Sequence, residues 1–434
     1  MTVSKLDAGS AVSPDESLIR FEKVPSYAEF QERCLLPNRP CIFPPGLIAH
    51  WPIVQTRAWA LPPSQDNNYD DKVQKVNWEA LKQAYPTHTS PVVITRTDPN
   101  GETQEERTEM TISAAIDLIS DFKQNKFDGG VQSVYIKDWH LIKQISRESV
   151  EPYTVPDVFA DDWMNNVSPG DAGKEVDDFR FVYAGTVNSR TLLHRDVYTS
   201  YSWSSNVVGS KRWYLFPPRS IPHLRRFPNV KTSELIPDIQ TLLSTITPTS
   251  THSAQQRKEY PHLHQAYTTV QIIDQTQGET IFIPSNWYHQ VENLTETISI
   301  NRNWCNSVNL PSLYQSIVDE LQHVEESLCD VKEMLSSNDS SATGEGWKEE
   351  FFTLIQDVAV QDAGWAWAGF WDMVVYNLEH PATASESRPK DGWMRERLRP
   401  LVDDFAERED ARWLNQKILE IAKRCKILLE AMGD

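Results

Sequence analysis

The stretch GETIFIPSNWYHQVENLTETISINRNW, residues 278–304, decides the fold class of this chain. It holds short runs of β-branched and aromatic residues, separated by turn-forming and polar residues. Such runs predict β-strands. Working outward, similar runs recur as FRFVYAGTV (179–187), SYSWSSNVVG (200–209), KRWYLFPP (211–218) and TTVQIID (268–274). Many short strands at this spacing predict a β-sandwich or barrel.

Upstream of this series, helix and strand signals are mixed. Residues 27–51 predict a helix, a proline-rich break and a short strand at 41–43. VQSVYIKDWHL, which starts at Val131, is the clearest strand within residues 75–150, because β-branched and aromatic residues dominate it.

After residue 309 the apolar residues follow a helical period. One stripe predicts a helix with Tyr314, Ile317, Leu321, Val324, Leu328, Val331 and Leu335 on one face. A linker is expected at 336–346, a helical pair carrying Trp365, Trp367 and Trp371 at 347–379, and a last helix at 411–432. The apolar stripes of these helices most simply face the core of the protein. The first stripe is also compatible with a homodimer but does not require one.

Three segments are therefore expected. Residues 1–20 are predicted to be a disordered tail, 21–310 a mainly β domain, and 311–434 a helical C-terminal region. A polar insertion with some helix and a flexible stretch is expected at about 219–267.

Composition narrows the class of protein. The 434 residues are 39% hydrophobic, as in ordinary globular proteins, and no stretch is long and apolar enough to span a membrane. The net charge of −19 disfavours nucleic-acid binding and is compatible with a basic protein substrate. Five scattered cysteines without a CxxC pair and no secretory signal predict a cytoplasmic protein, with the nucleus left open.

A metal site is predicted from three residues. His194 and Asp196 lie two apart in a β context, so both side chains face the same side, and His289 comes from a distant strand. Two histidines and one carboxylate form the facial triad of non-haem Fe(II) oxygenases. His323 and Glu325 have the same spacing on a predicted helix, where they point apart. Spacing alone leaves open that His194 and His289 are merely buried polar residues.

Lys211 is the candidate for binding an anion. It begins a strand whose next residues, Trp213, Leu215 and Phe216, are largely apolar. A buried lysine without a partner is costly, so an anionic partner is expected. The alternative is that Lys211 faces solvent at the start of its strand.

These motifs together resemble the Jumonji-C family of oxygenases. The resemblance rests on HRD (194–196), GSKRWYLFPP (209–218), GETIFIPSNWYHQV (278–291) and TISINRN (297–303), and covers roughly residues 27–310. It implies a double-stranded β-helix, a jelly-roll or cupin-like fold of eight core strands with helices packed outside.

The resemblance also implies a role for each site residue. His194, Asp196 and His289 would bind Fe(II), and Lys211 would bind 2-oxoglutarate, with O2 as the second substrate. Further cosubstrate contacts are implied at Thr191, Tyr135 and Asn303, and at Ser204 and Asn301, where the family often carries Asn and Thr.

The closest resemblance is to the Jumonji-C domain-containing protein four subgroup. Its members are assigned as lysyl hydroxylases of eukaryotic release factor one, which implies hydroxylation of a protein lysine. Two alternatives stay open: Nε-methyl-lysine demethylation, and a catalytically silent β-barrel that serves as a binding module. A tRNA-modifying oxygenase is disfavoured by the negative charge.

Overall fold

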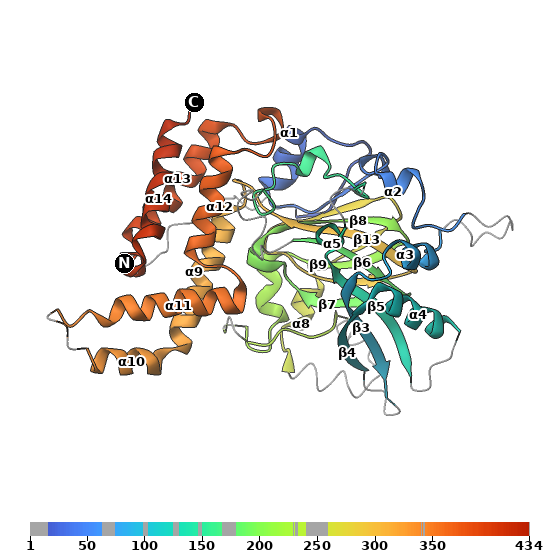
Figure 1. Ribbon diagram of the computed structural model, residues 1–434, viewed down its shortest axis with the longest axis horizontal. Coiled ribbons are helices and arrows are strands. Elements are labelled where there is room, and N and C mark those ends of the chain that lie inside the picture. The colour runs from blue at the N-terminus through green and yellow to red at the C-terminus, as the bar shows by residue number, and fades with distance from the viewer. Residues whose placement is uncertain are drawn as a thin grey trace.

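The computed structural model describes residues 16–433, apart from 63–73, 99–102, 125–129, 146–149, 167–178, 229, 231–232, 240–258, 340 and 342. The chain forms a β-rich body, and the C-terminal helices stack beside it as a separate layer (Figure 1). This arrangement agrees with the predicted mainly β core followed by a helical region.

The strands form two sheets. They are β1 (Ile19–Arg20), β2 (Cys41–Phe43), β3 (Thr89–Thr97), β4 (Thr103–Thr111), β5 (Val131–Trp139), β6 (Arg180–Gly185), β7 (Arg190–His194), β8 (Tyr201–Val208), β9 (Lys211–Phe216), β10 (Gln271–Gln275), β11 (Thr280–Ile283), β12 (Tyr288–Asn293) and β13 (Thr297–Trp304). The large sheet has the order β1-β2-β11-β8-β13-β6-β5-β3-β4, and the small sheet has the order β10-β9-β12-β7. Strands β6 to β13 alternate between the two sheets, except that β9 and β10 both lie in the small sheet, and this gives the expected eight-stranded double sheet.

Shorter helices surround the sheets. They are α1 (Tyr27–Phe30), α2 (Pro52–Gln55), α3 (Trp78–Ala84), α4 (Ile112–Lys123), α5 (Leu141–Gln144) and α8 (Leu263–Tyr267), with the 3-10 segments η2 (Pro45–Leu47), η4 (Asp157–Phe159), η6 (Val197–Thr199) and η7 (Pro218–Leu224) and the π-helical turn η1 (Gln31–Leu35). The predicted strands at 41–43 and from Val131 are confirmed as β2 and β5.

The predicted tail is wrong at its C-terminal end. Residues 19–20 form β1 and pair in parallel with β2, and Ile19 is buried in the main core. Residues 19–20 are ordered because β2 supplies partners for their backbone hydrogen bonds, and the local sequence pattern gives no sign of that pairing. The rest of that prediction, residues 1–15, lies outside the described residues.

The predicted insertion packs on the small sheet. Its described part includes η7 and α8, whose buried Leu224 and Leu263 share one apolar cluster with Tyr214 and Phe216 of β9. The predicted flexible stretch lies mostly within 240–258, outside the described residues.

The C-terminal region contains α9 (Leu310–Ser327), α10 (Cys329–Ser337), α11 (Trp347–Ala363), α12 (Trp367–Glu379), α13 (Asp391–Glu407) and α14 (Gln416–Ala431), with the 3-10 turns η8 (Ser385–Ser387) and η9 (Asp410–Trp413). None of the described helices is long and apolar enough to cross a bilayer. Helices α9 and α11 to α14 enclose one apolar core.

Three predictions for this region need correction. The Tyr314 stripe is broken at Leu328, and α10 buries none of its residues. Trp365 lies in the connection between α11 and α12 rather than on a helix. Helix α13 was not predicted, because Pro400 and a run of charged residues obscure its apolar face.

Candidate metal centre

The structure brings His194, Asp196 and His289 together between the two sheets. His194 ends β7, and His289 lies directly opposite it on the antiparallel strand β12. The two imidazole ring centres are 4.3 Å apart. One potential ligand atom from each of the three residues lies within 4.8 Å of the others. The local β pairing therefore creates the three-residue cluster that the sequence predicted.

Backbone carbonyls orient both imidazole rings. Nδ1 of His194 lies 2.7 Å from the carbonyl oxygen of Leu192, and Nδ1 of His289 lies 3.3 Å from that of Trp287. A carbonyl oxygen only accepts hydrogen bonds, so each Nδ1 carries the proton and donates it. Nε2 of each ring is left with a free lone pair, as metal-binding histidines require.

The electrostatics of the cluster also suit a metal ion. Burial lowers the pKa of His194 to about 4, with the neighbouring His289 as the second cause, so the imidazole is neutral near pH 7. The hydroxyl of Ser202 donates to one carboxylate oxygen of Asp196 at 2.7 Å. That bond orients the carboxylate and leaves its other oxygen for a ligand bond. This set of two nitrogen donors and one oxygen donor fits Fe(II) with open coordination positions.

The same cavity collects most of the other predicted site residues. It is lined by Tyr135, Tyr183, Thr191, His194, Asp196, Ser202, Lys211, Trp213, His289, Val291, Asn301 and Asn303. The hydroxyl of Tyr135 and that of Thr191 share a hydrogen bond.

Ser204 does not line this cavity. It lies opposite Asn301 in the β8–β13 pairing and donates its hydroxyl hydrogen bond to that side-chain amide oxygen at 3.0 Å. Ser202, two residues earlier on the same strand face, lines the cavity instead. Ser204 therefore adjoins the cavity through Asn301, and its part in binding the cosubstrate stays a prediction.

Lys211 points inward, not toward solvent. It follows the turn at Gly209, whose φ of +85° favours glycine and whose added Cβ would lie 2.1 Å from the carbonyl oxygen of Glu296. The lysine is 1% exposed, and its Nζ donates to the hydroxyl of Ser299 at 2.6 Å. Among the ion pairs of the described residues, none includes Lys211. Burial lowers its pKa to about 7, with the charge of Lys137 as a second cause.

Lys137 is a second cation near this cavity, although it is not one of the residues that line it, and the sequence analysis did not name it. Its Nζ lies 5.9 Å from the ring centre of Tyr135, two residues earlier on β5. Its charge also contributes to the lowered pKa of His194. The β5–β6 register shifts here, and Asp138 adopts a φ of +54° while it accepts hydrogen bonds from Tyr183 and Arg107. Side chains alternate between the two faces of a strand, so the position of Lys137 two residues after Tyr135 could have placed it on the cavity face.

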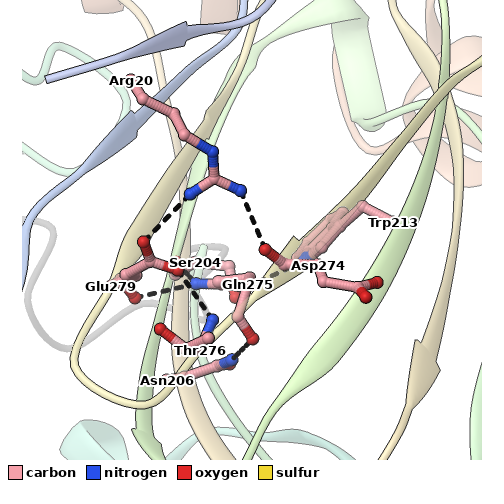
Figure 2. A network of polar contacts seen from close by, with 8 residues as sticks. All are labelled: Arg20, Ser204, Asn206, Trp213, Asp274, Gln275, Thr276 and Glu279. Carbon is pink, nitrogen blue, oxygen red and sulfur yellow. Dashed lines mark hydrogen bonds and ion pairs between the residues drawn. The ribbon is translucent and has the colours of Figure 1, made fainter.

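A polar network centred on Gln275 includes Trp213 (Figure 2). The Trp213 indole packs against the His289 ring, with ring centres 5.7 Å apart, and donates to the side-chain oxygen of Gln275 at 2.8 Å. The amide nitrogen of Gln275 in turn donates to the backbone carbonyls of Ser204 and Glu279, both at 2.8 Å. Gln275 is fully buried, so these bonds fix Trp213 in one orientation.

The second pair with this spacing, His323 and Glu325, does not form a metal site. His323 is exposed on α9, and Glu325 forms an ion pair with Lys332 at 2.7 Å. Among the described residues, the cluster of His194, Asp196 and His289 is the one arrangement of three such side chains close enough to share a metal ion.

Comparison with known proteins agrees with this fold and cluster. The model of the family described as "Cupin-like domain" matches residues 27–309. The mouse 2-oxoglutarate and iron-dependent oxygenase JMJD4 is 32% identical over 321 residues, which are 72% of this chain and 66% of that protein. The chicken JMJD4 oxygenase is 30% identical over 342 residues, covering 77% of this chain and 72% of the relative. The chain therefore belongs to the cupin-like domain family, in the group of the JMJD4 oxygenases.

A plant relative carries a different name. The Arabidopsis thaliana protein "Arginine-specific demethylase JMJ20" is 31% identical over 324 residues, which are 71% of this chain and 61% of that protein. Identity at this level is therefore shared between proteins whose names describe different reactions.

Proposed function

We propose that this protein is an Fe(II)- and 2-oxoglutarate-dependent hydroxylase that acts on a lysine side chain of a translation termination factor. The observation that carries the cofactor part is the cavity itself. A cluster suited to Fe(II) and the buried, unneutralised Lys211 line one cavity. An anion that also binds a metal is the ligand such a pairing would accept.

Each residue has a defined part in this proposal. His194, Asp196 and His289 would hold the iron, and Lys211 would bind the distal carboxylate of 2-oxoglutarate. When bound, the iron and 2-oxoglutarate supply O2 activation, in which 2-oxoglutarate becomes succinate and CO2 and one oxygen atom enters a substrate C–H bond.

The surrounding side chains would position the cosubstrate. The hydroxyls of Tyr135 and Thr191 lie at the same cavity, and Asn303 lines it from β13, where its amide donates to the hydroxyl of Ser200 at 3.2 Å. Burial keeps the pKa of Tyr135 well above its usual value, so this hydroxyl stays protonated and can donate to a carboxylate.

The substrate part of the proposal rests on similarity to the JMJD4 group. The resemblance of the motifs implies lysyl hydroxylation of eukaryotic release factor one. The net charge of −19 supports a basic protein partner over a nucleic acid. Removal of a methyl group from nitrogen is the second candidate, because a relative of comparable identity is named as an arginine demethylase.

The test is a mass-spectrometric assay with Fe(II), 2-oxoglutarate and ascorbate under air. Release factor one is offered in one reaction, and peptides with methylated arginine or lysine are offered in others. We expect a gain of one oxygen atom on a lysine of the release factor. Loss of methyl from a peptide instead would replace the hydroxylase proposal by a demethylase.

A matched variant separates the metal site from the substrate. His194→Asn keeps a polar side chain of similar size but removes the imidazole donor, so both product and succinate should disappear. If the wild-type protein binds neither metal nor 2-oxoglutarate, the silent binding module becomes the better account.

A further inference from the structure

The segment that follows the carboxylate of the metal centre has a strained backbone. Tyr198 and Thr199 both have a φ of +53°, a conformation that L-residues other than glycine rarely adopt. A β-branched threonine is especially unfavourable there. Such a conformation persists only when surrounding contacts impose it. Because the segment begins directly after Asp196, those contacts also determine where the carboxylate lies.

One of these contacts comes from the C-terminal helices. The ring of Tyr198 stacks on the indole of Trp365, with ring centres 4.7 Å apart and planes inclined by 22°. Trp365 follows Gly364, which ends α11 with a φ of +85°. The rings of Trp365 and Phe179, just before β6, also meet edge to face, with ring centres 6.2 Å apart. Trp365 is therefore held between two residues of the β body, although it belongs to the helical region.

A second contact comes from the first turn of α9. The hydroxyls of Thr199 and Ser312 lie 2.9 Å apart. Ser285, in the turn between β11 and β12, donates to the backbone carbonyl of Thr199 and also lies 2.9 Å from the hydroxyl of Ser312. The strained segment is thus fixed on one side by the β11–β12 turn and on the other by the helical region.

We propose that the C-terminal helical region positions the metal-binding carboxylate, through Trp365 stacked on Tyr198 and Ser312 bonded to Thr199. Trp365 is a positioning residue, since it acts on Asp196 through the segment of residues 197–199. The inference concerns metal affinity and goes beyond the hydroxylase proposal, because it would hold for any substrate.

The test is a titration of the metal-free protein with Mn²⁺, followed by electron paramagnetic resonance of the free ion. Trp365→Ala removes the stack, and we expect metal affinity to fall about tenfold, the lower end for groups that orient metal ligands. Trp365→Phe keeps an aromatic ring and should restore most of the affinity. Trp347→Ala is the matched control, because Trp347 is also a half-buried tryptophan of the helical core, but its ring contacts Phe351 at 5.8 Å between ring centres and not Tyr198.

Ser312→Ala keeps the test informative if Trp365→Ala fails to fold. It removes a single hydroxyl, and we expect a loss of metal affinity of about threefold, consistent with one neutral hydrogen bond. Wild-type affinity in both Ser312→Ala and a folded Trp365→Ala would overturn this inference alone. A wild-type protein that binds no Mn²⁺ would overturn both this inference and the proposed function.

Discussion

The two interiors of this molecule differ in chemical character. Between the sheets, buried histidine, lysine, serine and asparagine side chains surround a cavity. Within residues 310–433, the described buried side chains are apolar or aromatic except for Gln356 and Asn377. Burying polar groups costs free energy unless they are partnered. The double sheet therefore bears a cost that the helical core avoids, which identifies the sheet interior as the functional part.

The comparison also shows how the two parts depend on each other. The helical core is built almost entirely from apolar and aromatic side chains, which can pack closely without polar partners. Its contacts at Trp365 and Ser312 then support a strained segment that the β body holds beside Asp196. The following predictions, ordered from the largest expected effect to the smallest, test this division between binding and support.

The sharpest contrast comes from removing a metal ligand. His194→Ala should reduce succinate formation to the level of a reaction without enzyme, because two remaining ligands hold iron poorly. The melting temperature should change little, since His194 is half-buried and its imidazole makes one hydrogen bond, to the carbonyl of Leu192. Succinate quantification and circular dichroism measure the two effects. Retained turnover in a metal-dependent reaction would disprove the iron assignment.

Removing a tryptophan from the helical core should instead affect stability. Trp371 is 1% exposed and contacts the rings of Phe370 and Phe405 at 5.0 and 5.2 Å. Trp371→Ala should lower the free energy of unfolding by about 3–5 kcal/mol. Urea titration gives this value. A loss below about 1 kcal/mol would mean that this region is not the rigid core described above.

A third prediction concerns the buried cation. Lys211→Met should weaken 2-oxoglutarate binding about thirtyfold or more, because losing one partner of a buried charge pair costs about 2 kcal/mol or more. Stability without ligand should stay equal or rise, since the variant removes a buried amine that has no carboxylate partner. Calorimetric titration and thermal melting test both parts. Unchanged affinity would show that the anion binds elsewhere.

The smallest effect is a pH dependence. The pKa of Lys211 is lowered to about 7, so the amine loses its proton as the pH rises through that value. Binding of an anion requires the protonated amine, so binding takes up a proton above pH 7. The affinity for 2-oxoglutarate should then fall by about tenfold per pH unit between roughly pH 7 and 8 and stay level below that range. Lys211→Met should lack this slope.

Much of the β body could be predicted from sequence, for physical reasons. The strands of residues 179–304 combine β-branched and aromatic residues with clear turn residues, so local pattern and tertiary structure agree. The spacing of His194 and Asp196 carried information because side chains on a strand alternate between its faces. The third ligand, His289, was proposed from its place beside a distant strand, but only the resemblance to a family singled it out, since a pairing between residues 95 positions apart leaves no local signal.

The residues that were missed depend on tertiary contacts. Lys137 lies near the cavity beside a shifted register and a left-handed Asp138, whose side chain accepts hydrogen bonds from distant residues. Trp365 was expected on a helix because apolar period cannot distinguish a helix from the connection that ends it. Helix α13 was hidden by Pro400, which lies inside it.

The central claim is that the polar interior of the double sheet binds a metal ion and 2-oxoglutarate together. The most direct test is a calorimetric titration of 2-oxoglutarate into the wild-type protein, with and without Mn²⁺ and in the absence of O2. We predict one binding site per chain and an affinity that rises strongly when the metal is present. Equal binding with and without metal, or no binding in either case, would contradict the account.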